Sequence, residues 1–107
     1  MISNKEIQAI DRQYFDVLET TAFYVVLRSR NTGHFWHLLE QHPGSHVTFL
    51  ISHKHHEWNP YHPQANRPTI DDCCKYIKWH DRFHKQREKE KQSRRVNNDI
   101  PDTGHPS

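Results

Sequence analysis

The sequence predicts one small α+β domain with a two-layer α-β-β-β-α fold, in which a three-stranded antiparallel meander packs against two helices. Helix-start signals occur near both ends of the folded part, at Ser3 and at Thr69. Between them lie three runs rich in aromatic and β-branched residues, separated by turn residues. The length of 107 residues fits a single domain. We expect that domain to span residues 1–92 and to be followed by a disordered polar tail over 93–107.

The first helix is expected over about residues 3–20. Ser3 and Glu6 have the spacing of a capping box, and Ile2 with Ile7 fits a hydrophobic staple around that cap. Apolar residues then recur at helical spacing, namely Ile7, Ile10, Tyr14, Val17 and Leu18. This spacing predicts one apolar stripe that faces the sheet.

Three strands are expected in the middle of the chain, at about residues 22–30, 34–41 and 46–55. Their aromatic and β-branched residues favour extended structure. Asn31–Gly33 and Pro43–Gly44 supply the turns that join them. Residues 57–68 contain three prolines and no periodic pattern, and we expect a long loop there. Loops of that length are often functional.

The second helix is expected over about residues 70–90. Thr69 is a good N-cap, and Asp71 and Asp72 suit the positive end of the helix dipole. One side of this helix would carry Ile70, Cys73, Ile77, His80 and His84. A helix from each end would cover one face of the sheet, which leaves the other face open for a partner.

Composition limits the function classes. Only 33% of the residues are apolar, and the mean hydropathy is −1.08. No apolar run approaches the roughly 20 residues of a membrane span. The first ten residues lack the features of a signal peptide, so a cytoplasmic location is expected. Cys73 and Cys74 are adjacent and are expected to be free thiols, with Cys73 in the core.

Eleven histidines form the most unusual feature of the composition, and eight of them lie between His34 and His62. His53 and His55 would share one face of a strand, and His80 and His84 one face of a helix. These four are the candidate metal ligands, with a thiol of Cys73 or Cys74 as a possible addition, and zinc is the metal that such ligands suit. The spacing matches no known structural zinc pattern. The alternative is a set of polar histidines without metal, so no cofactor is expected.

The second helix is basic. Residues 78–95 contain eight basic and three acidic residues, although the net charge of the whole chain is only +2. Basic residues can neutralise phosphates, and interleaved aromatic residues can stack on bases. Nucleic-acid binding, to RNA or DNA, is therefore the leading expectation. The expected contact residues are Arg28, Arg30, Asn31, Lys54, Trp58, Tyr61, Lys78, Trp79, Arg82 and Lys85.

Two other functions compete with nucleic-acid binding. One is capture of a protein partner, as an interaction or inhibitor protein, through aromatic loop residues such as Trp58 and Tyr61. The other is a zinc-binding domain that uses the histidine and cysteine cluster. No enzyme is expected. The segment “HDRFH” at 80–84 resembles the zinc-protease pattern only superficially, because Asp81 is shorter than glutamate and no third ligand is evident.

Two resemblances add to this interpretation. The α-β-β-β-α order resembles the layout of double-stranded RNA-binding domains, in topology only. That family places lysines at the start of its second helix, whereas Asp71 and Asp72 stand there in this chain. The stretches “SRNTGHFW”, “ISHKHH”, “NPYHPQ” and “TIDDCCKYIKWHD” resemble small uncharacterised proteins of bacterial mobile genetic elements. That resemblance implies a role in transfer, regulation or defence evasion through binding to protein or nucleic acid.

Overall fold

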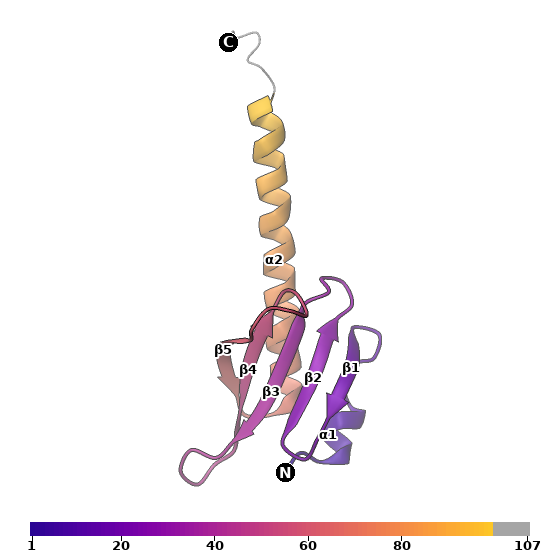
Figure 1. The fold of residues 1–107 in the computed structure, drawn as a ribbon, viewed down its shortest axis with the longest axis vertical. Coiled ribbons are helices and arrows are strands. Elements are labelled where there is room, and N and C mark those ends of the chain that lie inside the picture. The colour runs from indigo at the N-terminus through magenta and orange to yellow at the C-terminus, as the bar shows by residue number, and fades with distance from the viewer. Residues whose placement is uncertain (100–107) are drawn as a thin grey trace.

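The computed structural model describes residues 1–99, apart from the side chains of residue 88 and residues 90–99. It contains two helices and five strands (Figure 1). In chain order they are α1 (Asn4–Gln8), β1 (Phe15–Thr20), β2 (Tyr24–Ser29), β3 (Phe35–Gln41), β4 (Thr48–Lys54), β5 (His62–Arg67) and α2 (Ile70–Asp99). The α+β class is therefore confirmed. The predicted three-stranded meander is wrong in its strand count, because two further strands flank the predicted ones.

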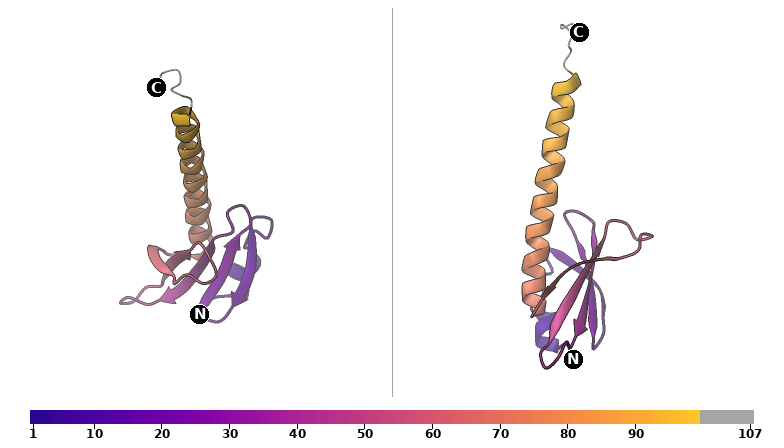
Figure 2. Two further views of the ribbon diagram at one scale, coloured as in Figure 1. Left: turned by 45° about the horizontal axis from the view of Figure 1, so that its top comes forward. Right: turned by 90° about the vertical axis from the view of Figure 1, so that its left-hand side faces the viewer.

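The five strands form one antiparallel sheet in the order β1-β2-β3-β4-β5, so each strand pairs with its neighbours in sequence. Helix α2 lies along one face of this sheet and then extends beyond it (Figure 2, right). No helix among the described residues covers the other face (Figure 2), although the sheet and its layers differ from the expected three-stranded arrangement. The two faces differ along β3, where Trp36 and Leu38 are buried under α2 while Phe35 and His37 are half-buried on the open face.

The expected helix over residues 3–20 is much shorter, and its second half is strand β1. The capping box is confirmed, since Ser3 Oγ accepts a hydrogen bond from the Glu6 amide and the Glu6 side chain accepts one from the Ser3 amide. The helix ends at Gln8. Arg12 Nη1 donates to the carbonyls of Ile7 and Ile10, and Asp11 accepts from the Gln13 amide in a turn. These side-chain bonds compete with continuation of the helix.

Strand β5 lies within the segment that was expected to be a loop. Its sequence, “HPQANR”, has no β-branched residue and contains Pro63, which cannot donate to a ladder. An edge strand tolerates proline because one side of it pairs with nothing. Strand β5 is such an edge, paired only with β4, and the register shifts between Ile51 and Ser52.

Helix α2 begins as predicted, because Thr69 Oγ1 accepts a hydrogen bond from the Asp72 amide at 3.0 Å. It continues to Asp99, past the expected end near residue 90 and into the predicted tail; residues 100–107 lie outside the described residues. Ile70, Cys73 and Ile77 are buried in the core, as the spacing predicts. Both cysteines are free and buried, which confirms the expectation of free thiols. No helix in the described part of the chain combines the length and apolar character that a membrane span requires.

Candidate metal centre

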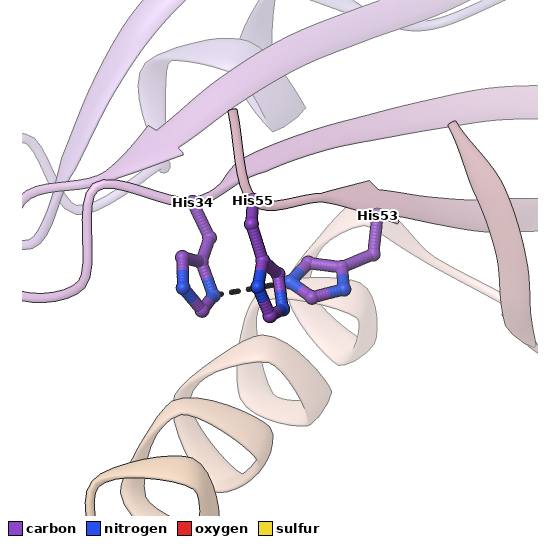
Figure 3. Close-up of side chains that lie close together, drawn as sticks. All are labelled: His34, His53 and His55. Carbon is purple, nitrogen blue, oxygen red and sulfur yellow. Dashed lines mark hydrogen bonds between the residues drawn. The ribbon is translucent and has the colours of Figure 1, made fainter. Parts of the chain in front are cut away.

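Three histidines meet on the side of the sheet that faces α2, where β3 begins and β4 ends (Figure 3). His34 precedes β3, His53 lies in β4, and His55 follows β4. Strand alternation puts His53 and His55 on the same face. The antiparallel register pairs Trp36 with His53, and its continuation by two residues brings His34 opposite His55. The pairing of the two strands therefore assembles this histidine triad, consisting of His34, His53 and His55.

The nitrogens of the histidine triad lie within reach of one ion. One ligand nitrogen from each ring can be chosen so that all three lie within 4.8 Å of one another. His53 Nε2 and His34 Nδ1 are 3.1 Å apart and share a hydrogen bond, drawn as the dashed line in Figure 3. The rings of His34 and His55 stack, with centroids 4.1 Å apart and an interplanar angle of 9°.

Helix α2 adds two histidines to the same cluster. The His84 ring centroid is 4.8 Å from that of His34 and 5.5 Å from that of His55. The His80 ring centroid is 5.0 Å from that of His53. His80 Nδ1 is buried and has no hydrogen-bond partner within the described residues. Buried polar atoms are nearly always satisfied, so an orphan nitrogen beside four other imidazoles is a feature that requires an explanation.

Burial keeps His34 and His53, the two buried histidines of the triad, neutral. His34 is 7% exposed and His53 is 6% exposed. Desolvation, with a smaller contribution from the neighbouring imidazoles, lowers the pKa of His34 to about 4 and the pKa of His53 to about 3. Desolvation also lowers the pKa of His80. At neutral pH these rings have lone pairs that can bind a cation without first losing a proton.

A polar network fixes the segment that carries His34. Thr32 Oγ1 accepts a hydrogen bond from the His34 amide, and it donates to Asp81 Oδ1 at 3.4 Å. Asp81, which is fully buried in α2, also accepts a 2.6 Å hydrogen bond from the Tyr14 hydroxyl. Gly33 takes a φ of +74°, which its lack of a side chain permits. The turn, the sheet and the helix are thus joined next to the triad.

Part of this site was predicted from the sequence. Of the four predicted ligands, the structure places His53 and His55 in the triad, and His80 and His84 beside it on α2. His34 was missed, because only the strand register shows that it lies opposite His55. The proposed thiol ligands are elsewhere, since Cys73 and Cys74 belong to the hydrophobic core. Burial raises the pKa of each thiol to about 12, so neither is a ready thiolate.

The residues expected to contact nucleic acid fall into separate groups. Two cations, Arg28 and Lys54, flank Phe35 on the open sheet face, and Lys54 Nζ lies 4.4 Å from the Tyr61 ring centroid. Two other cations are paired, Arg30 with Asp16 at 3.0 Å and Lys78 with Asp11 at 3.2 Å. Trp58 is 80% exposed and Trp79 is 57% exposed. The remaining three, Asn31, Arg82 and Lys85, line one cavity near His34.

Comparison with known proteins yields no match: no protein-family model, no curated protein and no solved structure is significantly similar to this chain.

Proposed function

We propose that this protein is a metal-binding domain whose ligands are the histidine triad His34, His53 and His55. The proposal is supported by the convergence of three imidazole nitrogens within 4.8 Å from two neighbouring strands. It is a binding function, and it includes no reaction.

The spacing of the nitrogens is close to that of a zinc site. Zinc–nitrogen bonds of about 2.0–2.1 Å in a tetrahedron place the ligand atoms roughly 3.3 Å apart. His53 Nε2 and His34 Nδ1 already lie 3.1 Å apart, and the widest separation allowed within the triad is 4.8 Å. His55 completes the triad; it is exposed and follows the end of β4.

The ligand type favours a late first-row transition metal. Imidazole nitrogen suits zinc, copper and nickel, whereas magnesium and calcium require oxygen ligands. The triad contains no carboxylate. Zinc is the simplest candidate because it readily accepts three nitrogens and one further ligand.

Two hollows lie beside the triad and offer routes for an ion. One is lined by His34 and His84, and the other by His53 and His55. A metal site without a path to solvent could not be loaded after folding. The alternative is a metal-free histidine cluster held by ring contacts and hydrogen bonds such as that between His34 and His53, and a direct measurement distinguishes the two possibilities.

The test is native mass spectrometry of the untagged protein after loading with one equivalent of zinc, with titration calorimetry for affinity. We expect one bound zinc ion in the wild type and at least a tenfold loss of affinity in His55→Ala. This variant should fold, because His55 is exposed. His46→Ala is the matched control, since His46 is an exposed histidine outside the cluster. Absence of stoichiometric zinc, or equal affinity in both variants, would reject the proposal.

We propose nucleic-acid binding as a second candidate function, supported by the open sheet face. The register aligns Arg28, Phe35 and Lys54 in one row across β2, β3 and β4. Arg28 Cζ lies 5.6 Å and Lys54 Nζ 5.4 Å from the Phe35 ring centroid. An aromatic ring between two cations suits a base stacked between neutralised phosphates.

Salt dependence tests this second candidate. Single-stranded oligonucleotides should bind with an affinity that falls steeply as salt rises, and Arg28→Gln with Lys54→Gln should weaken binding and reduce that slope. Lys75→Gln is the control, because Lys75 is an exposed cation of α2 that pairs with Asp71. Oligonucleotide binding that changes neither with salt nor with the Arg28→Gln and Lys54→Gln substitutions would count against this candidate function.

A further inference from the structure

A cationic cavity adjoins the histidine triad. It has a volume of about 850 Å³ and lies between the turn that joins β2 to β3 and the middle of α2. His34 and His84 form the part of its lining that belongs to the histidine cluster. The lining also includes Asn31 from the turn and Arg82, Lys85 and Lys89 from the helix.

The charges of this cavity have one sign. Arg82, Lys85 and Lys89 are three and four residues apart, so they share one side of α2, and all three are exposed. The lining residues that the structure describes include no carboxylate. The nearest buried acid, Asp81, already accepts hydrogen bonds from Tyr14 and Thr32. Three cations with no carboxylate among the described lining residues concentrate anions in a hollow.

The metal site would present a further positive charge to the same cavity. The triad supplies three ligands, and a zinc ion with three protein ligands keeps a fourth position for an exogenous group. His34 belongs both to the triad and to the cavity lining, so one side of the centre faces the cavity. The cations and the open position therefore act on the same small volume.

We propose that this cavity binds a phosphate group, with one phosphate oxygen at the open position of the metal and the others held by Arg82 and Lys85. The inference rests on the proposed metal function. A guanidinium offers a planar fork for two phosphate oxygens, and an ammonium offers a point charge. The Asn31 side-chain amide is a further donor at the rim. The shared ligand chemistry is a phosphate dianion, either free or as a monoester.

The role of His84 distinguishes the proposed site, which has an open position on the metal, from a site in which His84 is the fourth ligand. If His84 were the fourth metal ligand, no position would remain for phosphate. In the proposed arrangement His84 borders the anion instead of the metal. His84→Ala should therefore leave metal affinity within about threefold of the wild type. Loss of a residue that binds the metal, or of one that orients such a ligand, would instead lower metal affinity about 10–100-fold or more.

The experiment uses cobalt(II) as a spectroscopic substitute for zinc in the full chain, with cobalt kept below one equivalent. Phosphate that enters the coordination sphere should change the visible absorption of the bound cobalt. We expect inorganic phosphate to produce this change, and Arg82→Gln with Lys85→Gln to weaken phosphate binding at least tenfold while cobalt affinity is kept. Lys75→Gln, which removes a cation from α2 outside the cavity, should leave both affinities unchanged.

Each failure has a separate meaning. Cobalt that binds but does not respond to millimolar phosphate overturns this inference and leaves the metal function standing. No binding of cobalt overturns both. Equal phosphate affinity in the metal-free and metal-loaded protein overturns the metal-bridged arrangement. A nucleoside 5′-monophosphate that binds more tightly than inorganic phosphate identifies a monoester as the ligand, whereas equal affinities identify free phosphate.

Discussion

The interface between α2 and the sheet has two ends with different chemistry. At the end where α2 begins, Ile70, Cys73 and Ile77 are buried in one core cluster with Leu38 and Ile51. At the other end, His80 and His84 of the same helix meet the triad of the sheet. The backbone elements are the same, and only the side chains change.

The two ends differ in what their buried side chains contribute to the stability of the fold. Apolar burial stabilises the fold in proportion to the area removed from water. Buried imidazoles carry a desolvation cost, and an apolar group of the same shape in their place is often neutral or stabilising. Packing alone therefore does not account for five converging histidines. The proposed metal, which would bind the folded state, would account for them.

Acid should reveal the largest difference between the two ends. In metal-free protein, the pKa values of His34 and His53 are lowered to about 4 and about 3 in the folded state, against about 6.5 when unfolded. The unfolded chain therefore binds more protons below pH 6.5, so stability falls as the pH is lowered from 7 to 5. Linkage gives about 2 kcal/mol for each histidine over that range.

Denaturant unfolding of the metal-free protein at pH 7, 6 and 5 measures this loss. Carboxylates titrate mainly below pH 5, so the window reports on histidines. His37 and His80 have pKa values lowered by burial and should add in the same direction. A free energy of unfolding that stays constant between pH 7 and 5 would show that the cluster is open to protons in the folded state.

Truncation of the apolar end should break the fold without changing the metal site. Ile77 is fully buried, and Ile77→Ala should cost about 3 kcal/mol through lost burial and the cavity left behind. Denaturant midpoints measure the cost, and calorimetry with zinc measures the affinity of the folded variant. We expect an unchanged zinc affinity under conditions where the variant is folded. A large loss of zinc affinity would mean that the two ends are not separable.

Metal should stabilise the protein through the histidine end alone. Free zinc at one hundred times its dissociation constant should add about 2.7 kcal/mol to the free energy of unfolding. For a domain of this size, that corresponds to a rise in Tm of roughly 10 °C or more. At the same free zinc the rise should fall by half or more in His55→Ala, since a tenfold loss of affinity leaves about 1.4 kcal/mol, and it should persist in Ile77→Ala. An equal rise in His55→Ala would place the bound metal outside the triad.

The sequence predicted the two ends unequally. The side of α2 that faces the sheet followed from helical spacing, because Ile70, Cys73 and Ile77 are spaced by three and four residues. His53 with His55, and His80 with His84, followed from strand and helix periodicity. His34 did not, because its position opposite His55 depends on the pairing of two strands, and no local pattern encodes that pairing.

The two missed strands have different physical causes. Tyr14, just before β1, and Val17 and Leu18 within it continue a helical spacing that the Asp11 turn interrupts. In β5, Pro63 removes a donor and the sequence lacks β-branched residues, so its extended form depends on the hydrogen bonds of β4. Tertiary pairing overrode local propensity in both cases.

The smallest expected change in stability concerns Asp81, at the boundary between the apolar end and the histidine end of α2. Asp81 is fully buried there and accepts the Tyr14 hydroxyl at 2.6 Å. Burial and the neighbouring carboxylate raise the pKa of Tyr14, so its phenol remains a donor at all moderate pH values. Tyr14→Phe removes that donor and leaves Thr32 as the hydrogen-bond donor to Asp81 in the described part of the chain. The expected cost is about 1–2 kcal/mol.

Zinc affinity of Tyr14→Phe then decides whether the boundary matters for the site. Among the described residues, Thr32 links Asp81 to His34 by hydrogen bonds: its hydroxyl donates to Asp81 and accepts from the His34 amide. If this network only stabilises the fold, the denaturant midpoint falls and zinc affinity stays within about twofold. If it also positions His34, zinc affinity falls severalfold as well, and Thr32→Val should reproduce that loss. A variant as stable as the wild type would show that water replaces the phenol, and that the boundary contributes to neither end.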